Sequence, residues 1–277
     1  MQSLINHLNQ LQELLLIRDE HRTTGDGRHM DRLNDSIDQL TDKLPAEVKS
    51  HYQRLYKRDH IVMAPMHNGS CAICGMHMST GQVQAVRLCK SIQNCPSCAR
   101  ILYEEVDAPR WVGEAPNRTE PRKSGISRFS AESLMITGLE ATTAGGAIEK
   151  LAKIMEEKKF VSGADKLVQS AMERENVLST AMEHGLAFPH VRGVEGGGLT
   201  LALGIAKTGI KWDDSGAVVN IVFFITIPTA VSAFYLRLMS GLTETFLKEQ
   251  NRQALLDSET PAQLWKALTK ATRYSIK

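Results

Sequence analysis

The chain has 277 residues, of which 42% are hydrophobic and 23% charged, and its formal net charge is +2. These values are typical of a globular protein with about two domains of ~150 residues each. The near-neutral charge argues against nucleic acid or an anionic membrane as the main partner. The first leucines are interleaved with polar residues and follow no basic segment, so we predict no signal peptide and a cytoplasmic location.

Two apolar stripes with heptad spacing occupy the N-terminal region. The first comprises Leu4, Leu8, Leu11 and Leu15, and the second comprises Met30, Leu33, Ile37, Leu40 and Leu44. The sequence Gly-Asp-Gly at 25–27 suits a turn between them, so the pattern predicts an antiparallel helical hairpin. Pro45 ends the second helix, and Val48, Tyr52 and Leu55 predict a short third one. Stripes this short need a partner, and whether that partner is the other arm or a second subunit, as a homodimer, stays open.

The next segment, residues 71–103, carries two C-x-x-C pairs. Cys71 and Cys74 form the first pair, and Cys95 and Cys98 form the second. Four thiolates on two tight turns suit a tetrahedral Zn²⁺ site with no open coordination position, which predicts a structural metal. Without an export signal, metal binding is favoured over disulfides, and a redox dithiol is typical of a single C-x-x-C. Cys89 lies outside the pairs and is expected to be a small buried side chain.

The N-terminal part resembles the C4-type zinc-ribbon proteins with an N-terminal helical hairpin. The resemblance covers residues 1–105 and is most specific at the four cysteines and at the sequence RILY, 100–103. It implies a helical hairpin or short coiled coil in residues 1–60 and a zinc ribbon in residues 61–105. It also implies a binding module that contacts protein or nucleic acid and carries out no chemistry. The hairpin here is shorter than the coiled coil of those relatives.

A proline- and arginine-rich segment separates this part from the rest of the chain. Residues 106–130 contain Pro109, Pro116 and Pro121 and few apolar residues, which is typical of a linker. After it, strands are predicted at 134–136, 199–206 and 218–227, and helices at 144–158, 165–174, 233–250 and 261–272. Alternation of this kind predicts an α/β domain over residues 131–277, with a mixed sheet flanked by helices, and hence a multidomain chain.

One uncharged run, residues 215–236, is long enough to cross a membrane. The β-branched and aromatic residues at 218–227 favour a buried strand, and Pro228 interrupts the run. We therefore predict a core strand followed by a helix, and no membrane span.

The sequence GLAFPH at 185–190 places His190 directly after Pro189. Because proline has a fixed φ angle, the turn that carries the histidine is expected to be stiff. A neutral imidazole is a good nucleophile near pH 7, and Arg174 and Arg192 are candidates for binding phosphate oxygens. A lone loop histidine is more often an ordinary surface residue, so this motif does not establish a site by itself. The nearby His184 lacks the preceding proline and is expected at the surface.

The surrounding motifs resemble the type-2 (mannitol/fructose) EIIA domain of the bacterial phosphotransferase system. They are Arg-Glu at 174–175, Ser-Thr at 179–180, GLAFPH itself, GIKWD at 209–213 and LRLMSGL at 236–242. The resemblance covers about residues 131–277. It implies that His190 accepts a phosphoryl group from a phosphohistidine carrier protein like HPr. By the same resemblance, Arg174 stabilises the phosphate and Thr180 is a nearby polar residue of the site.

One departure from that family concerns its second histidine. Members that pass the phosphoryl group to sugars often have a histidine where this chain has Tyr235, and Val191 stands where a small residue is common. Tyrosine donates a hydrogen bond but provides no cationic ring, so phosphate stabilisation is weaker or Arg192 compensates. This favours a regulatory role over sugar transfer.

The sequence therefore predicts a IIA-like phosphocarrier or regulator, reversibly phosphorylated on His190. The zinc ribbon would dock it to an unknown downstream protein, and phosphoryl transfer is the most chemistry that we expect. Two alternatives stay open: a non-enzymatic adaptor with a degenerate IIA-like sensor domain, and a zinc-ribbon module that binds nucleic acid or protein.

Overall fold

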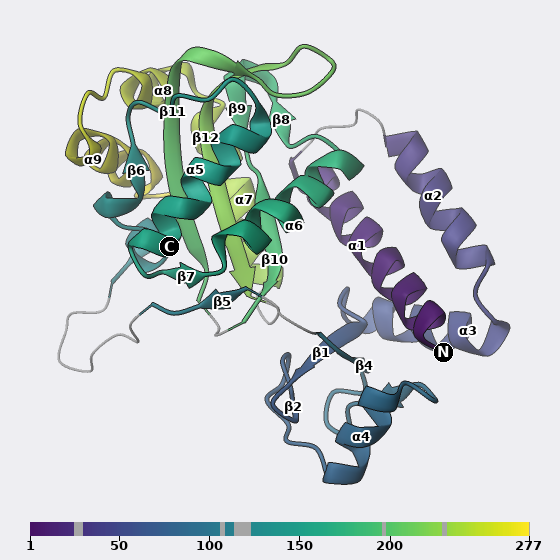
Figure 1. The fold of residues 1–277 in the computed structure, drawn as a ribbon. Helices are drawn as coiled ribbons and strands as arrows, with labels where there is room; N and C mark the ends of the chain where they lie inside the picture. Colours follow the sequence, from purple (N-terminus) through teal and green to yellow (C-terminus); the bar gives the residue numbers. More distant parts are fainter. Residues whose placement is uncertain (25–29, 106–108, 114–122, 196–197, 229–231, 277) are drawn as a thin grey trace. The chain divides into compact units, whose positions relative to one another are not determined.

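The computed structural model describes residues 1–24, 30–105, 109–113, 123–195, 198–228 and 232–276. It divides the chain into two compact units, Met1–Asp107 and Ala108–Lys277 (Figure 1). Each unit has its own strands, helices and core, and the two are described in turn. The turn predicted at 25–27 lies outside the described residues.

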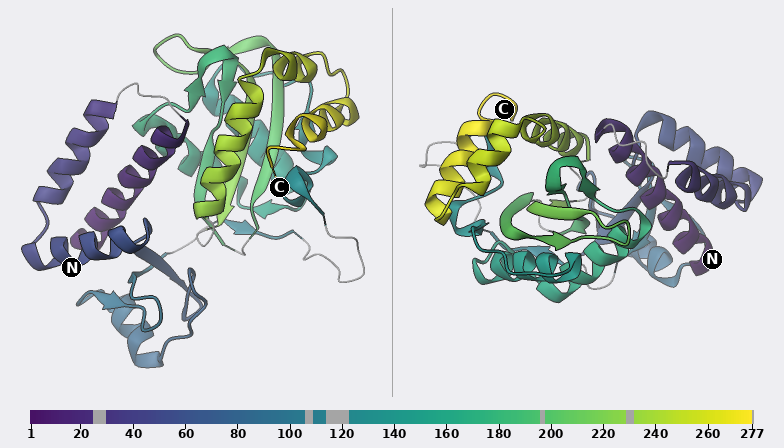
Figure 2. Two further views of the ribbon diagram at one scale, coloured as in Figure 1. Left: turned by 180° about the vertical axis from the view of Figure 1, so that it is seen from behind. Right: turned by 90° about the horizontal axis from the view of Figure 1, so that it is seen from above.

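The first unit begins with three helices, α1 (Gln2–Thr24), α2 (Met30–Asp42) and α3 (Ala46–Arg58). Helices α1 and α2 lie side by side (Figures 1 and 2). The ring Nε2 of His7, near the start of α1, is 2.7 Å from the carbonyl oxygen of Leu40, near the end of α2, so the two helices run antiparallel. Most of each predicted stripe is buried, including Leu8, Leu11, Leu15, Leu33 and Ile37. The expectation of N-terminal helices is thus confirmed.

The rest of the first unit is a small sheet with one helix. Its strands follow the order β2-β1-β4-β3, with bounds Ser70–Cys71, Met63–His67, Ile101–Glu104 and Gln93–Asn94, and α4 spans Thr80–Leu88. β1 pairs parallel with β4, and the other pairs are antiparallel. Few apolar residues form the core, and Cys71 and Cys95 belong to it. Cys89, which we expected to be buried, is instead half-buried and ends α4 with a left-handed φ of 48°.

The second unit is built on a mixed sheet of the order β6-β11-β12-β9-β8, with β10 also paired to β12. The strands are β6 (Met135–Ile136), β8 (Ala181–Met182), β9 (Leu186–Ala187), β10 (His190–Val194), β11 (Thr200–Lys211) and β12 (Val218–Pro228). β11 and β12 are antiparallel, whereas β9 and β10 both run parallel to β12. The predicted strands at 134–136, 199–206 and 218–227 are confirmed, and β10 was not predicted.

Part of the expected linker 106–130 has regular structure. β5 (Arg110–Trp111) pairs antiparallel with β7 (Val161–Ser162), and Gly125–Arg128 form a 3₁₀ turn. Both segments belong to the second unit.

Helices cover both faces of the large sheet. α5 (Ala144–Glu157) and α6 (Ala164–Val177) lie on one face, and α7 (Ser232–Phe246) lies on the other (Figures 1 and 2). Phe223 of β12 is a fully buried residue of the core. Its ring stacks on Phe188 with centroids 5.0 Å apart and also contacts Phe246 of α7. Two further helices, α8 (Glu249–Leu256) and α9 (Pro261–Thr272), complete the unit. The predicted α/β fold is thus confirmed.

The single helix expected at 233–250 is wrong, because α7 ends at Phe246 and α8 begins at Glu249. The sequence contains no glycine or proline at this point. Side chains of α8 satisfy the last carbonyls of α7 instead: Asn251 donates to the Thr245 oxygen, and Arg252 Nη1 donates to the oxygens of Phe246 and Leu247. Capping of this kind lets a helix end without a breaking residue.

The uncharged run 215–236 contributes to strand β12 and to the start of α7. Among the helices in the described part of the chain, none has the length and apolar character that a membrane span requires.

We predict that Gly204→Ala destabilises the second unit. A Cβ at this position of β11 would lie 2.7 Å from Leu139 Cδ2 and 3.3 Å from Leu151 Cδ2. Because both leucines are buried, we expect a loss of about 1–3 kcal/mol in the free energy of unfolding, as is usual for overpacking. Urea unfolding followed by tryptophan fluorescence measures the effect. Gly138→Ala is the control, since a Cβ there meets nothing within 4 Å, and equal effects of the two substitutions would contradict the prediction.

Candidate functional site

His190 is the first residue of strand β10 and lies opposite Ile225 of β12. The carbonyl of the preceding Pro189 accepts a hydrogen bond of 3.0 Å from the Ile225 N–H. The histidine is only 3% exposed. The sequence suggested a stiff turn at His190, but the residue instead begins a strand and is buried. Pairing of β10 with β12 places His190 in the interior of the second unit. His184 is exposed, as expected.

The two ring nitrogens of His190 have different partners. Nδ1 is 3.0 Å from the carbonyl oxygen of Phe188, and Nε2 is 3.3 Å from Nε of Arg174. A carbonyl oxygen only accepts and a guanidinium only donates, so this arrangement favours the tautomer with its proton on Nδ1. The lone pair then lies on Nε2, beside the arginine. This is the nitrogen that can act as a nucleophile.

Arg174 is held in place by its own helix terminus. It lies in the last turn of α6, and its Nη1 donates a hydrogen bond of 2.7 Å to the carbonyl of Leu178, the residue that ends that helix. A basic side chain near a helix C-terminus interacts favourably with the helix dipole. The guanidinium thus has a defined position beside Nε2 of His190.

Tyr235 and Arg192 complete the surroundings of the imidazole. The Tyr235 ring, from α7, lies 5.3 Å from the His190 ring at an angle of 48°. The Arg192 guanidinium carbon lies 4.9 Å above the Tyr235 ring, which is within cation–π distance. The structure therefore brings Arg174, Arg192 and Tyr235 together around His190.

Thr180, the remaining predicted site residue, makes its side-chain contact with Glu175. Its hydroxyl donates to Glu175 Oε2 at 2.7 Å, and its backbone N–H donates to Oε1 at 2.6 Å. Trp212 Nε1 donates to the same Oε1 at 2.6 Å. Our sequence reasoning assigned no role to Glu175 or Trp212, although both stand inside motifs that carry the family resemblance.

Asp213 anchors the residue before Thr180. Ser179 Oγ donates to Asp213 Oδ2 at 2.6 Å, and Ser215 donates to Oδ1 through its backbone and hydroxyl. Burial by itself would raise the pKa of Asp213. The hydrogen bonds from Ser179 and Ser215 outweigh burial and hold that pKa below its ordinary value.

The four predicted metal ligands form one cluster in the first unit. The sulfurs of Cys71, Cys74, Cys95 and Cys98 all lie within 4.8 Å of one another. The Cys71–Cys98 and Cys74–Cys95 sulfur separations are 3.8 and 3.5 Å. A tetrahedral centre with Zn–S bonds of about 2.3 Å separates its sulfurs by about 3.8 Å. The four cysteines thus have the spacing that such a metal requires and could bind one.

The thiols of this cluster differ in acidity. Burial raises the pKa of Cys71 and of Cys98. Burial also opposes ionisation of Cys74, but hydrogen bonds from the Met76 backbone and from the neighbouring thiols lower its pKa to about 7. A metal ion binds thiolates, so its charge would have to replace the protons of the cluster.

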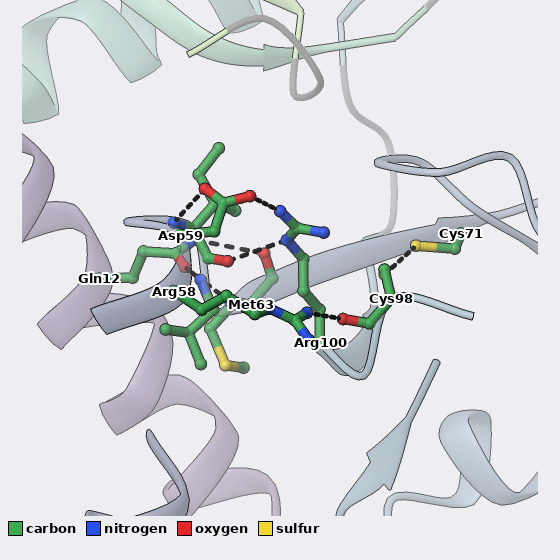
Figure 3. A network of polar contacts seen from close by, with 9 residues as sticks. Gln12, Arg58, Asp59, Met63, Cys71, Cys98 and Arg100 are labelled. Carbon is green, nitrogen blue, oxygen red and sulfur yellow. Dashed lines mark hydrogen bonds and ion pairs between the residues drawn. The ribbon is translucent and has the colours of Figure 1, made fainter. Parts of the chain in front are cut away.

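Two arginines connect the cysteine cluster to α3 (Figure 3). Arg58, at the end of α3, donates to the Cys98 carbonyl, and the buried Arg100 pairs with Asp59 and donates to the Ile61 oxygen. On the other side of this network, Gln12 of α1 accepts from the N–H groups of Val62 and Met63, at 2.6 Å each. Helices α1 and α3 and the segments that carry the four cysteines are therefore joined within one unit.

Comparison with known proteins finds a family that matches the second unit. Residues 128–271 match the family described as phosphoenolpyruvate-dependent sugar phosphotransferase system, EIIA 2. The match covers more than half of the chain, and the chain belongs to this family.

Among its relatives, the mannitol-specific phosphotransferase enzyme IIA component of Staphylococcus aureus is 30% identical over 141 residues, which are 49% of this chain and 91% of that protein. The fructose-specific EIIA component of Haloferax volcanii is 28% identical over 121 residues, 43% of this chain and 77% of that protein. Among solved structures, the nitrogen regulatory protein IIA-Ntr of Neisseria meningitidis has a TM-score of 0.48 and 21% identity, over 52% of this chain and 99% of that one. For the first unit, the cysteine cluster remains the observation that suggests a zinc ribbon.

We predict that Ser179→Ala raises the pKa of Asp213 towards its ordinary value, because one of its hydrogen-bond donors is lost. A carboxyl with a depressed pKa contributes stability above its unfolded pKa of about 3.9, and this is lost as the pH falls through the folded pKa. Acid destabilisation below about pH 4 should therefore be weaker in the variant. Carbon-13 NMR titration of Asp213 and urea unfolding at two pH values measure both effects. Ser170→Ala, on α6, is the control, and an unchanged Asp213 titration in Ser179→Ala would contradict the prediction.

Proposed function

We propose that this chain is a phosphocarrier or regulator of the phosphotransferase system that is reversibly phosphorylated on Nε2 of His190. Its donor is a phosphohistidine carrier protein like HPr. Membership of the EIIA 2 family supports a phosphocarrier-like function. The observation that carries the assignment to this residue is the contact of His190 Nε2 with Arg174, while Nδ1 is bound to the Phe188 carbonyl.

The proposed transfer needs no proton acceptor at the site. The P–N bond of the donor phosphohistidine breaks as Nε2 of His190 forms a new P–N bond, and the donor ring keeps the electron pair. The proton on Nδ1 of His190 stays in its hydrogen bond to the Phe188 carbonyl, so the phosphorylated ring carries a positive charge beside the negative phosphoryl group. The guanidinium of Arg174 adds a fixed positive charge with the planar geometry that suits phosphate oxygens.

The burial of His190 bears on what happens to the phosphoryl group. The imidazole is packed against Tyr235, with Arg192 over the same ring, so we infer that this pair moves aside when a carrier protein docks. Tyrosine supplies no second imidazole for passing the phosphoryl group onward. Both features support a regulatory readout of the phosphorylation state over rapid delivery to a sugar.

The first unit, in this proposal, is a docking module with a structural zinc ion on Cys71, Cys74, Cys95 and Cys98. A zinc ion held by four thiolates stabilises the fold and performs no chemistry. The small core around the cysteines supports this, because metal binding would supply folding energy that the apolar residues cannot. The partner of the module is a protein downstream of the phosphorylation step.

A second candidate function is a non-enzymatic adaptor whose IIA-like domain is no longer phosphorylated. The near-complete burial of His190 beside Tyr235 is the observation that favours it. It differs from the first candidate in one measurable respect, because the adaptor gains no phosphate.

We predict that the full-length protein gains one acid-labile phosphate when incubated with phosphoenolpyruvate, enzyme I and HPr, as read by intact mass. His190→Ala should gain none, because the nucleophile is missing. Arg174→Ala should be phosphorylated on the order of 100-fold more slowly, the usual effect of removing one preorganised donor. His184→Ala, on the exposed histidine, is the control. Equal phosphorylation of wild type and His190→Ala, or none of either, would exclude the first candidate.

We also predict about one zinc ion per chain in freshly purified, reduced protein, because four thiolates fill one tetrahedral site. The double variant Cys71→Ser, Cys95→Ser should lose the metal, and residues 71–103 should lose their protection from hydrogen exchange. Mass spectrometry of metal content and of amide exchange measure both. Cys89→Ser is the matched control, since this cysteine lies outside the cluster. Protein without metal, or an equal loss in Cys89→Ser, would contradict the prediction.

A further inference from the structure

We infer that Glu175 is a positioning residue for His190 and fixes the partners of both imidazole nitrogens. This inference rests on the proposed function of His190 as a phosphoryl acceptor. Glu175 is 8% exposed, and its carboxylate accepts hydrogen bonds from Thr180 and Trp212. It acts through Thr180, which it binds by both the backbone N–H and the hydroxyl.

The first route leads to Nε2. Glu175 fixes Thr180, two residues after Leu178, and thereby the short segment that follows α6. The Leu178 carbonyl accepts from Arg174 Nη1 at 2.7 Å, and Arg174 Nε contacts His190 Nε2 at 3.3 Å. Displacement of the segment therefore moves the guanidinium away from the nitrogen that would receive the phosphoryl group.

The second route leads to Nδ1. The Thr180 carbonyl accepts a hydrogen bond of 3.2 Å from the Phe188 N–H. The carbonyl of the same Phe188 is the partner of His190 Nδ1 at 3.0 Å. Thr180 thus holds the backbone of Phe188, whose carbonyl selects the tautomer. Both sets of contacts begin at the Glu175 carboxyl group.

The position of Glu175 is unfavourable for its own helix. It lies in the last turns of α6, where a negative charge interacts poorly with the helix dipole. Three donors compensate for its burial: two from Thr180 and one from Trp212 Nε1 at 2.6 Å. Trp212, the residue directly after β11, anchors the carboxyl group beside the sheet. A residue that served only helix stability would not be acidic here, whereas a residue that ties α6 and the Thr180 segment to the sheet needs acceptors.

The test compares Glu175→Ala, Glu175→Gln and the control Glu173→Ala in the full-length protein. Glu173 is an exposed carboxylate on the same helix, bonded to Gln169. Nitrogen-15 NMR of the histidine rings gives the tautomer of His190. Single-turnover phosphorylation at increasing phospho-HPr concentrations gives the maximal rate constant of transfer, written here as kcat, and the half-saturating phospho-HPr concentration, written here as KM. Circular dichroism and thermal unfolding report whether each variant folds.

We expect Glu175→Ala to populate both tautomers of His190 and to lower kcat about 10- to 100-fold with KM for phospho-HPr unchanged, as misplacement of reacting groups does. Glu175→Gln keeps one acceptor and should lie between Glu175→Ala and wild type, and Glu173→Ala should match wild type. If Glu175→Ala does not fold, Thr180→Val, which removes only the hydroxyl donor, should shift the tautomer and kcat in the same direction.

A folded Glu175→Ala with the wild-type tautomer and kcat would overturn the inference, as would a Thr180→Val without effect when Glu175→Ala is unfolded. If the wild type takes up no phosphate, the proposed function fails, and the NMR measurement alone then decides whether Glu175 positions the ring.

Discussion

The parallel pairing of β10 with β12 is the constraint on which the candidate site depends. It places His190 opposite Ile225 at the start of a strand and fixes the direction of its side chain. Because β12 is a central strand of the sheet and most of its residues are buried, the histidine is paired with a buried strand. Arg174 from α6 and Tyr235 from α7 then approach the imidazole from elements that lie on opposite faces of the sheet.

Backbone carbonyls set the positions of the groups that contact His190. The carbonyls of Leu178, Thr180 and Phe188 accept hydrogen bonds that set the positions of Arg174 and of the ring. Backbone acceptors move only if their segments move. The positions of these carbonyls therefore depend on the contacts that Glu175 and Asp213 make with those segments. In the first unit, the four cysteine sulfurs lie close together, and few apolar side chains surround them.

Some features could be predicted because they depend on neighbours along the chain. The heptad stripes predicted α1 and α2, and the β-branched run predicted β12. The two C-x-x-C pairs predicted the cysteine cluster. Others depend on contacts between distant residues. α7 and α8 separate because Asn251 and Arg252 cap carbonyls, and no breaking residue marks that place. Strand β10 was missed because it is short and its hydrogen bonds come from β12.

The sequence by itself determined the residue types of the site and the family to which the chain belongs, because motifs such as Arg-Glu and GLAFPH are local. It also predicted that the four cysteines lie together, because the spacing of two C-x-x-C pairs places thiolates on two tight turns. Only the tertiary structure decided that His190 is buried, that its two nitrogens differ, and that Thr180 binds Glu175. These properties arise from hydrogen bonds between elements far apart in the sequence, and a linear pattern does not specify which donors and acceptors meet.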